Sequence, residues 1–179
     1  MVTVTKMEAA SRQLDTAIQL FFSGGDSIAI HSLATAAANV FADIAERKES
    51  VSWRTRTRDS SGLSMKELKC ILHNSWNFFK HADSDTDGKL IFNEQENQDL
   101  MFMAVLDCGE LYNTSCAMQA FQLWYIAAYP HSFSETDAIF SEAQKLFPAI
   151  CGLSYTDKIN RGAQFFRENC TQADVISTD

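Results

Sequence analysis

A chain of 179 residues is long enough for one domain with a sizeable core, and its formal charge of −8 argues against broad binding to nucleic-acid phosphates. Only 2 prolines and 7 glycines interrupt it, which favours long helices over many short strands. The 5 cysteines form no CxxC pair, no signal-peptide core precedes the first helix, and no apolar run reaches the ~20 residues of a membrane span. We therefore expect a cytoplasmic protein with reduced, buried thiols.

Two helices are predicted first, joined by a very short turn. Thr5 and Glu8 have the spacing of a capping box, and apolar residues then recur at helical intervals. Gly24-Gly25 ends this helix, and Asp26 can cap the next, which extends to about residue 47. So short a connection predicts an antiparallel helical hairpin.

A polar stretch and a third helix follow. Residues 49–63 are predicted to form a loop, with the basic segment Trp53–Arg58 at its centre. Ser64 and Glu67 form a second capping-box pattern, which opens a helix that continues to about Ala82.

The rest of the chain also has helical periodicity. We expect four more helices: Gln95–Leu111; one capped by Asn113 or Thr114 and ended by Pro130; one capped by Ser132 or Ser134 and ended by Pro148; and Thr156–Asn169. Residues 171–179 are predicted to be a frayed tail. The predicted fold class is all-α, with one helical domain over residues 1–179 that forms a bundle of about six to seven helices.

The third predicted helix carries a polar stripe opposite its apolar side. Asn77 and His81 are one turn apart, with Lys80 beside them and Asp83 at the helix end. An imidazole can exchange a proton near neutral pH, and an ammonium can hold an anion, so these four residues are candidate ligand-binding residues. The alternative is an ordinary solvent-facing surface. His31, on an apolar helix face, is expected to be a core histidine with one hydrogen-bond partner.

An acidic loop follows the stripe and has most of the spacing of an EF-hand. Ile91 occupies a position that needs a polar ligand, and the next helix begins with polar residues, which argues against tight calcium binding. The alternative is an acidic interhelical loop with Asx-turns. The candidate calcium ligands are Asp83, Asp85, Asp87, the Lys89 carbonyl and Glu94.

Three segments resemble a family of uncharacterised bacterial helical proteins. They are the opening Lys6–Phe22, the segment Ala29–Ala37 and the block Asn77–Asp83. The resemblance covers about the first two thirds of the chain. That family in turn resembles the HEPN helical bundles, many of which are ribonucleases or toxin-antitoxin components with an Arg-Asn-x-x-x-His motif at a dimer interface. Here Asn77 and His81 match the motif, but Trp76 stands where the arginine would be.

These observations leave three functions open. The first is a cytoplasmic, HEPN-like homodimer that acts as a binding or regulatory module, has no cofactor, and takes a protein or a small anionic or polar ligand at Asn77, Lys80 and His81. The second is a calcium-binding protein that uses the loop 83–94. The third is a degenerate or atypical HEPN-type ribonuclease with Asn77, Lys80 and His81 as catalytic candidates, although the arginine is missing.

Overall fold

The computed structural model describes residues 1–81 and 86–170, and the described part of the chain is helical without strands. This confirms the all-α class. Over these ranges it contains nine α-helices and two short 3₁₀ helices, more than the predicted six to seven: α1 (Lys6–Ser23), α2 (Ser27–Arg47), α3 (Trp53–Ser61), α4 (Met65–Leu72), α5 (Asn74–Lys80), α6 (Glu96–Leu111), α7 (Cys116–Ala128), η1 (Pro130–Ser132), α8 (Ala138–Leu146), η2 (Ile150–Gly152) and α9 (Tyr155–Asn169).

The first two helices form the predicted hairpin. The Thr5 hydroxyl accepts a hydrogen bond from the Glu8 backbone N–H, and the Glu8 carboxylate accepts one from the Thr5 N–H, so the capping box is complete. Gly24 ends α1 with a φ of 72°, a left-handed conformation that glycine adopts without strain. Asp26 caps α2 through the Ala29 N–H at 2.9 Å.

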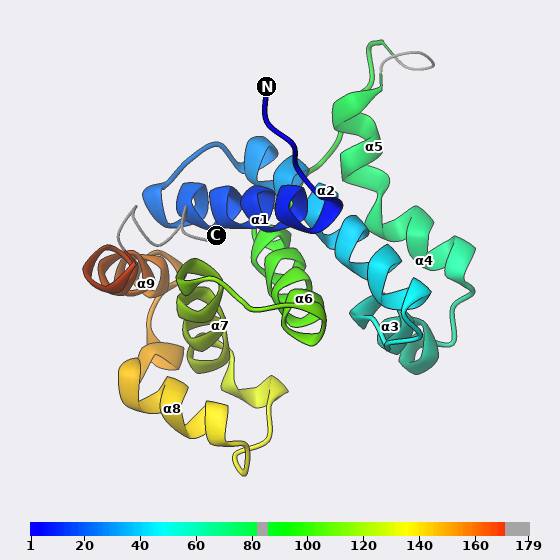
Figure 1. The fold of residues 1–179 in the computed structure, drawn as a ribbon. Coiled ribbons are helices and arrows are strands. Elements are labelled where there is room, and N and C mark those ends of the chain that lie inside the picture. The colour runs from blue at the N-terminus through cyan, green and yellow to red at the C-terminus, as the bar shows by residue number, and fades with distance from the viewer. Residues whose placement is uncertain (82–85, 171–179) are drawn as a thin grey trace.

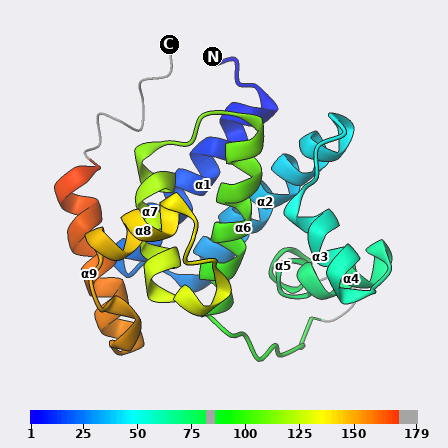
Figure 2. The same ribbon diagram turned by 90° about the horizontal axis from the view of Figure 1, so that it is seen from below.

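The remaining helices are arranged around this hairpin. Helix α2 packs against α1 and α6, and α7 packs against α1 and α6. Helices α8 and α9 cover α7, whereas α3, α4 and α5 lie on the far side of α2 (Figure 1; Figure 2). By length and composition alone α2 is apolar enough to cross a membrane, but half of its most apolar window is buried within the molecule. Here it is the central core helix.

An aromatic cluster fills the core between α1 and α7. The rings of Phe21, Phe22, Phe121 and Trp124 have centroids 5.4–5.9 Å apart, mostly in edge-to-face or tilted contacts. The Trp124 indole N–H donates to the Lys158 carbonyl at 2.7 Å, which attaches α9 to the cluster.

The predicted loop at residues 49–63 is wrong, because Trp53–Ser61 forms α3. Ser52 caps this helix by accepting the Thr55 N–H at 3.1 Å. Trp53 and Arg54, the first two residues of α3, are buried and are 7% and 2% exposed. Their burial against the neighbouring helices outweighs the weak helix preference of the alternating threonines.

The predicted continuous helix from Ser64 to Ala82 is also wrong. Its N-terminal capping box with Glu67 is confirmed, but the helix breaks at His73, which has φ −99° and ψ 1°. Two shorter helices, α4 and α5, result. Ala82 itself lies outside the described residues, as does the predicted frayed tail 171–179.

The prediction of reduced, buried thiols holds only for Cys108. Cys116 and Cys170 form a disulfide, which corrects that expectation, and Cys70 and Cys151 are free but exposed. Pairing needs two Cα atoms within about 7 Å, and spacing along the sequence does not reveal this proximity.

Two helix starts in the C-terminal half differ from those predicted. Ser115, rather than Asn113 or Thr114, caps α7 by accepting the Met118 N–H. Helix α8 begins only after Asp137 rather than at Ser132 or Ser134, and the chain forms η1 directly after Tyr129. Helix α9 matches its predicted range to within one residue.

We predict that Gly162→Ala destabilises the protein. A Cβ atom at this position would lie 2.6 Å from the Trp124 Cδ1 atom, so α9 would have to move away from the aromatic cluster. We expect a loss of about 1–3 kcal/mol in the free energy of unfolding, although alanine normally favours a helix over glycine. Denaturant unfolding measures this loss.

The matched control is Gly152→Ala, where an added Cβ meets no atom within 4 Å. Its free energy of unfolding should stay within about 0.5 kcal/mol of the wild-type value. Equal effects of the two substitutions would contradict the close approach of α9 to Trp124.

Candidate functional site

The predicted polar residues lie on an exposed helix. Asn77, Lys80 and His81 are all exposed, and α5 has no buried residue. Asp83, the fourth predicted ligand-binding residue, lies outside the described residues. The Lys80 ammonium sits 3.3 Å from the centroid of the Trp76 ring, a cation–π contact at the position where the HEPN motif has its arginine. Within this one chain, the three described residues line an outer helix surface rather than a sheltered groove.

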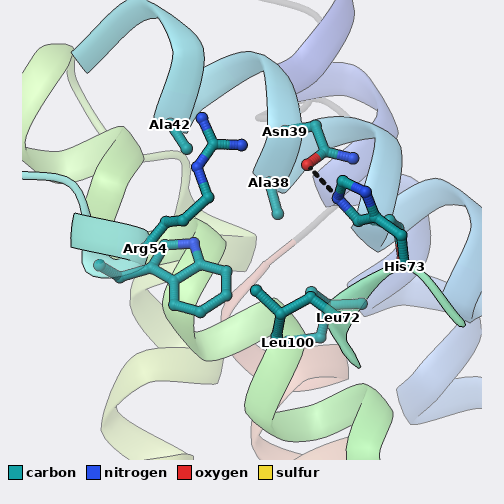
Figure 3. A pocket seen from close by; sticks show the side chains of 9 residues that line it. Ala38, Asn39, Ala42, Arg54, Leu72, His73 and Leu100 are labelled. Atoms are coloured by element: carbon teal, nitrogen blue, oxygen red, sulfur yellow. Dashed lines mark hydrogen bonds between the residues drawn. The ribbon is translucent and has the colours of Figure 1, made fainter. Parts of the chain in front are cut away.

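His73, at the break between α4 and α5, turns inward instead. Its Nε2 atom lies 2.8 Å from Asn39 Oδ1 on α2, and because that oxygen only accepts, Nε2 carries the proton (Figure 3). Burial, followed by the positive charges of Arg54, Lys69 and Lys80, lowers the pKa of His73. The imidazole is therefore neutral near pH 7 and attaches the α4–α5 junction to α2.

A small cavity lies beside His73, between α2, α3, the end of α4 and α6. About 10 Å³ is open to the centre of a water molecule, so it has room for no more than one water. The Thr35 hydroxyl and the Trp53 indole N–H are buried without a hydrogen-bond partner and belong to residues that line it. The full lining is Thr35, Ala38, Asn39, Ala42, Trp53, Arg54, Leu72, His73 and Leu100 (Figure 3).

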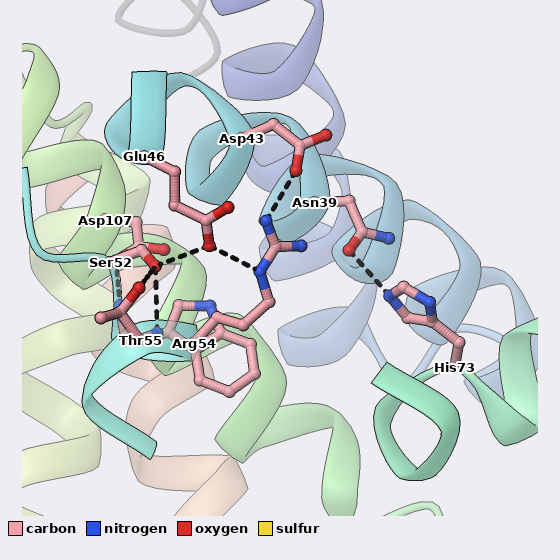
Figure 4. A network of polar contacts seen from close by, with 9 residues as sticks. Asn39, Asp43, Glu46, Ser52, Arg54, Thr55, His73 and Asp107 are labelled. Atoms are coloured by element: carbon pink, nitrogen blue, oxygen red, sulfur yellow. Dashed lines mark hydrogen bonds and ion pairs between the residues drawn. The ribbon is translucent and has the colours of Figure 1, made fainter. Parts of the chain in front are cut away.

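Arg54 is the charged centre of this region. Its Nη2 donates to Asp43 Oδ1 at 2.6 Å and its Nε donates to Glu46 Oε1 at 3.0 Å, both on α2 (Figure 4). Burial alone would lower the pKa of Arg54, but the hydrogen bonds and charges of these carboxylates together raise it. The guanidinium therefore stays charged and joins α3 to α2.

Asp107 lies on α6 and attaches the start of α3 to that helix. Its Oδ1 accepts the Trp53 backbone N–H at 2.7 Å, while its Oδ2 is buried without a partner (Figure 4). Burial raises the pKa of Asp107 to about 6, against which the Trp53 hydrogen bond and the nearby arginines act more weakly. Sequence reasoning missed both Arg54 and Asp107. The available signal was an arginine-rich segment in a strongly acidic chain.

The acidic loop is described only in part. Asp83 and Asp85 lie outside the described residues, whereas Asp87 and Lys89 are exposed. The Glu94 carboxylate accepts a hydrogen bond from the Ser27 hydroxyl at 2.9 Å, which places it at the start of α2. Within residues 1–81 and 86–170, no three His, Cys, Asp or Glu side chains are grouped as metal ligands.

The prediction that His31 is a core histidine is confirmed. His31 is 4% exposed, and its Nδ1 lies 2.9 Å from Asn97 Oδ1. Phe79 and Phe92 contact its ring edge-to-face, and burial lowers its pKa. These aromatic contacts anchor the end of α5 and the segment before α6 to α2.

Comparison of the sequence with protein-family models, with curated proteins and with solved structures gave no match. The HEPN-like resemblance therefore stays a prediction.

We predict that Asp107 makes the stability of the protein depend on pH. Its pKa in the folded state is about 6, above the ordinary value of 3.8, so the folded protein holds this proton more tightly than the unfolded chain. The contribution of Asp107 to stability should therefore fall by about 2 kcal/mol as pH rises from 4 to 7.

The test compares the wild type with Asp107→Asn, which keeps an Oδ1 acceptor for Trp53. The difference in the free energy of unfolding, wild type minus variant, should decrease as the pH is raised from 4 to 7. His31 and His73, whose lowered pKa values cost stability on acidification, act equally in both proteins. Glu135→Gln, which removes an exposed carboxylate that does not contribute to the pKa shift of Asp107, is the control. A pH-independent difference for Asp107→Asn would contradict the raised pKa.

Proposed function

We propose that the protein is a homodimeric binding module, and that two copies meet through one exposed surface of α4 and α5. We call this surface the α4–α5 stripe. The observation that carries the proposal is its composition, since exposed apolar and amide side chains lie between one carboxylate and two basic groups. The stripe consists of Glu67, Ile71, Asn74, Asn77, Phe78, Lys80 and His81.

Two large apolar side chains are exposed in the middle of this stripe. Ile71 is 63% exposed and Phe78 is 38% exposed, and they lie seven residues apart along the chain, one on each side of the break at His73. Aromatic residues are enriched in the centres of protein interfaces, and charged residues are depleted there. Pairing with a second copy would remove both apolar side chains from water.

The acidic and basic side chains at the two ends of the stripe complement each other under a two-fold rotation. Glu67 and His81 lie equally far from Asn74 along the chain, on opposite sides. A two-fold axis near Asn74 would therefore place Glu67 of each copy against His81 of the other, with Lys80 adjacent. It would also bring Ile71 of one copy close to Phe78 of the other.

The Glu67 carboxylate is available for this pairing. Both hydrogen bonds that it accepts from Ser64 fall on Oε2. The Ser64 hydroxyl and backbone N–H lower the pKa of Glu67, so the side chain is charged at neutral pH. Its Oε1 atom can then accept from a cation of the second copy.

The dimer gives the polar residues a shared role. Asn77, Lys80 and His81 of both copies would line the seam between the two stripes, and two sets of amide and basic groups would meet there. Such a seam suits an anionic or polar partner, because each copy supplies an ammonium and an imidazole.

We predict that Ile71→Glu disrupts the dimer, because it places a carboxylate in the apolar centre of the stripe. The dimer dissociation constant should rise at least about tenfold, as expected for a central interface residue. Light scattering over a micromolar concentration range measures it. Ile139→Glu on α8, also at an exposed apolar position, should leave the dimer unchanged. A monomeric wild type over that range would contradict the proposal.

A second prediction tests the position of the axis. Asn74→Cys should crosslink two copies under mild oxidation, because residues beside a two-fold axis approach within disulfide distance. The background Cys70→Ser/Cys151→Ser removes the two exposed thiols. Asn93→Cys, an exposed position outside the stripe, is the control and should stay uncrosslinked. Equal crosslinking of both variants on a non-reducing gel would contradict an axis at Asn74.

A further inference from the structure

The Cys116–Cys170 disulfide closes the C-terminal part of the fold. It joins the first residue of α7 to the residue that directly follows α9, across 54 positions of the chain. The two Cα atoms lie 5.8 Å apart. Everything from α7 to α9 therefore belongs to one covalent loop.

Apart from the disulfide, α9 is attached to the molecule mainly by contacts of its first three turns. The Lys158 carbonyl accepts from Trp124, Gly162 and Ala163 are the fully buried residues of the helix, and Phe166 packs on Phe22 with ring centroids 5.5 Å apart. After Phe166 the helix surface changes, since residues 167–169 are exposed. Cys170, by contrast, is 8% exposed. The disulfide is thus the attachment of the last turn of α9 to the rest of the molecule.

The other cysteines indicate what kind of disulfide this is. Cys70 and Cys151 are exposed free thiols, and Cys108 is a buried one. Exposed thiols persist in reducing surroundings, where disulfides are usually transient and redox-sensing. Exposed free thiols and a disulfide in the same chain are consistent with a disulfide that forms and breaks.

We propose that Cys116 and Cys170 form a reversible redox latch on the end of α9. In the oxidised state the latch holds the last turn of α9 against the start of α7. In the reduced state that turn opens, while Gly162 and the contact with Trp124 keep the first three turns in place.

A low-molecular-weight thiol of the glutathione class supplies the electrons. Its thiolate attacks one sulfur of the latch, forms a mixed disulfide and releases the other sulfur as a thiolate. A second thiol attacks the mixed disulfide and releases the remaining cysteine, so two thiols become one disulfide and two electrons pass to the protein. The two protons that the thiols lose go to Cys116 and Cys170, and the disulfide form of the same thiol reverses the reaction.

The location of Cys116 assists this exchange. It is the first residue of a 13-residue helix whose N-cap, Ser115, accepts the Met118 N–H. A thiolate at this end of α7 lies at the positive pole of the helix dipole and is stabilised there. A disulfide that can release this stabilised Cys116 thiolate is therefore easier to reduce than a disulfide between two exposed loops.

The experiment uses the full chain in the Cys70→Ser/Cys151→Ser background, equilibrated with mixtures of reduced and oxidised glutathione. Mass spectrometry after alkylation counts the free thiols, and hydrogen exchange reports the opening. Across the series we expect two thiols to appear together, and the protection of amides 167–170 to fall at least about tenfold on reduction. Protection in α2 and α6 should stay constant.

Three outcomes would overturn the latch. These are a protein in which Cys116 and Cys170 stay free in oxidised glutathione, a disulfide that stays intact in reduced glutathione, and equal protection of residues 167–170 in both states. Cys170→Ser adds a check that does not depend on the reductant, since oxidised glutathione should leave its amide protection at the level of the reduced protein. If oxidised glutathione raised the protection of amides 167–170 in the Cys170→Ser variant, that result would also overturn the latch.

Discussion

The buried guanidinium of Arg54 is the constraint on which the α3–α5 side of the molecule depends. A charge that is 2% exposed needs partners, because desolvation without them costs several kcal/mol. Asp43 and Glu46, one turn apart on α2, supply them at 2.6 and 3.0 Å. Removing either carboxylate would leave one guanidinium N–H without its acceptor, so the position of α3 on α2 is closely specified.

Once α3 is fixed, the location of the next two helices follows. Asp107 holds the start of α3 on α6, and the short turn after α3 leads directly into α4. His73 then bonds Asn39, one turn before Asp43 on the same helix, so the α4–α5 junction lies beside Arg54. This inward turn at the junction leaves the opposite side of α4 and α5 in solvent. The exposed stripe is thus a consequence of how the buried side is anchored.

The sequence predicted the elements whose signals are local. Capping boxes at Thr5 and Ser64 and the helix end at Gly24 depend on residues within one turn, and each is confirmed. Helix α3 and the break at His73 depend on partners in other helices, such as Asn39, 34 residues away, and periodicity does not contain them. The disulfide spans 54 residues and is beyond any pattern of spacing. For the same reason the polar residues of α5 were predicted, but periodicity did not decide between a ligand site and the solvent-facing surface that was the alternative.

The two surfaces to which we assign roles lie on opposite sides of the central hairpin (Figure 1). Helix α9 contacts α1, α7 and η2, whereas α5 contacts α2 and α4. Between them lies the close-packed core of α1, α2, α6 and α7, where Leu14, Phe41 and Phe121 are fully buried. Such a core resists deformation, so opening the last turn of α9 costs only local contacts and leaves the α4–α5 stripe unchanged. Coupling between the two would require α1 to shift against α2, and the contacts of this hairpin are among the most extensive in the described part of the chain. The fold therefore favours independent behaviour of the two surfaces to which we assign the proposed redox latch and the proposed pairing of copies.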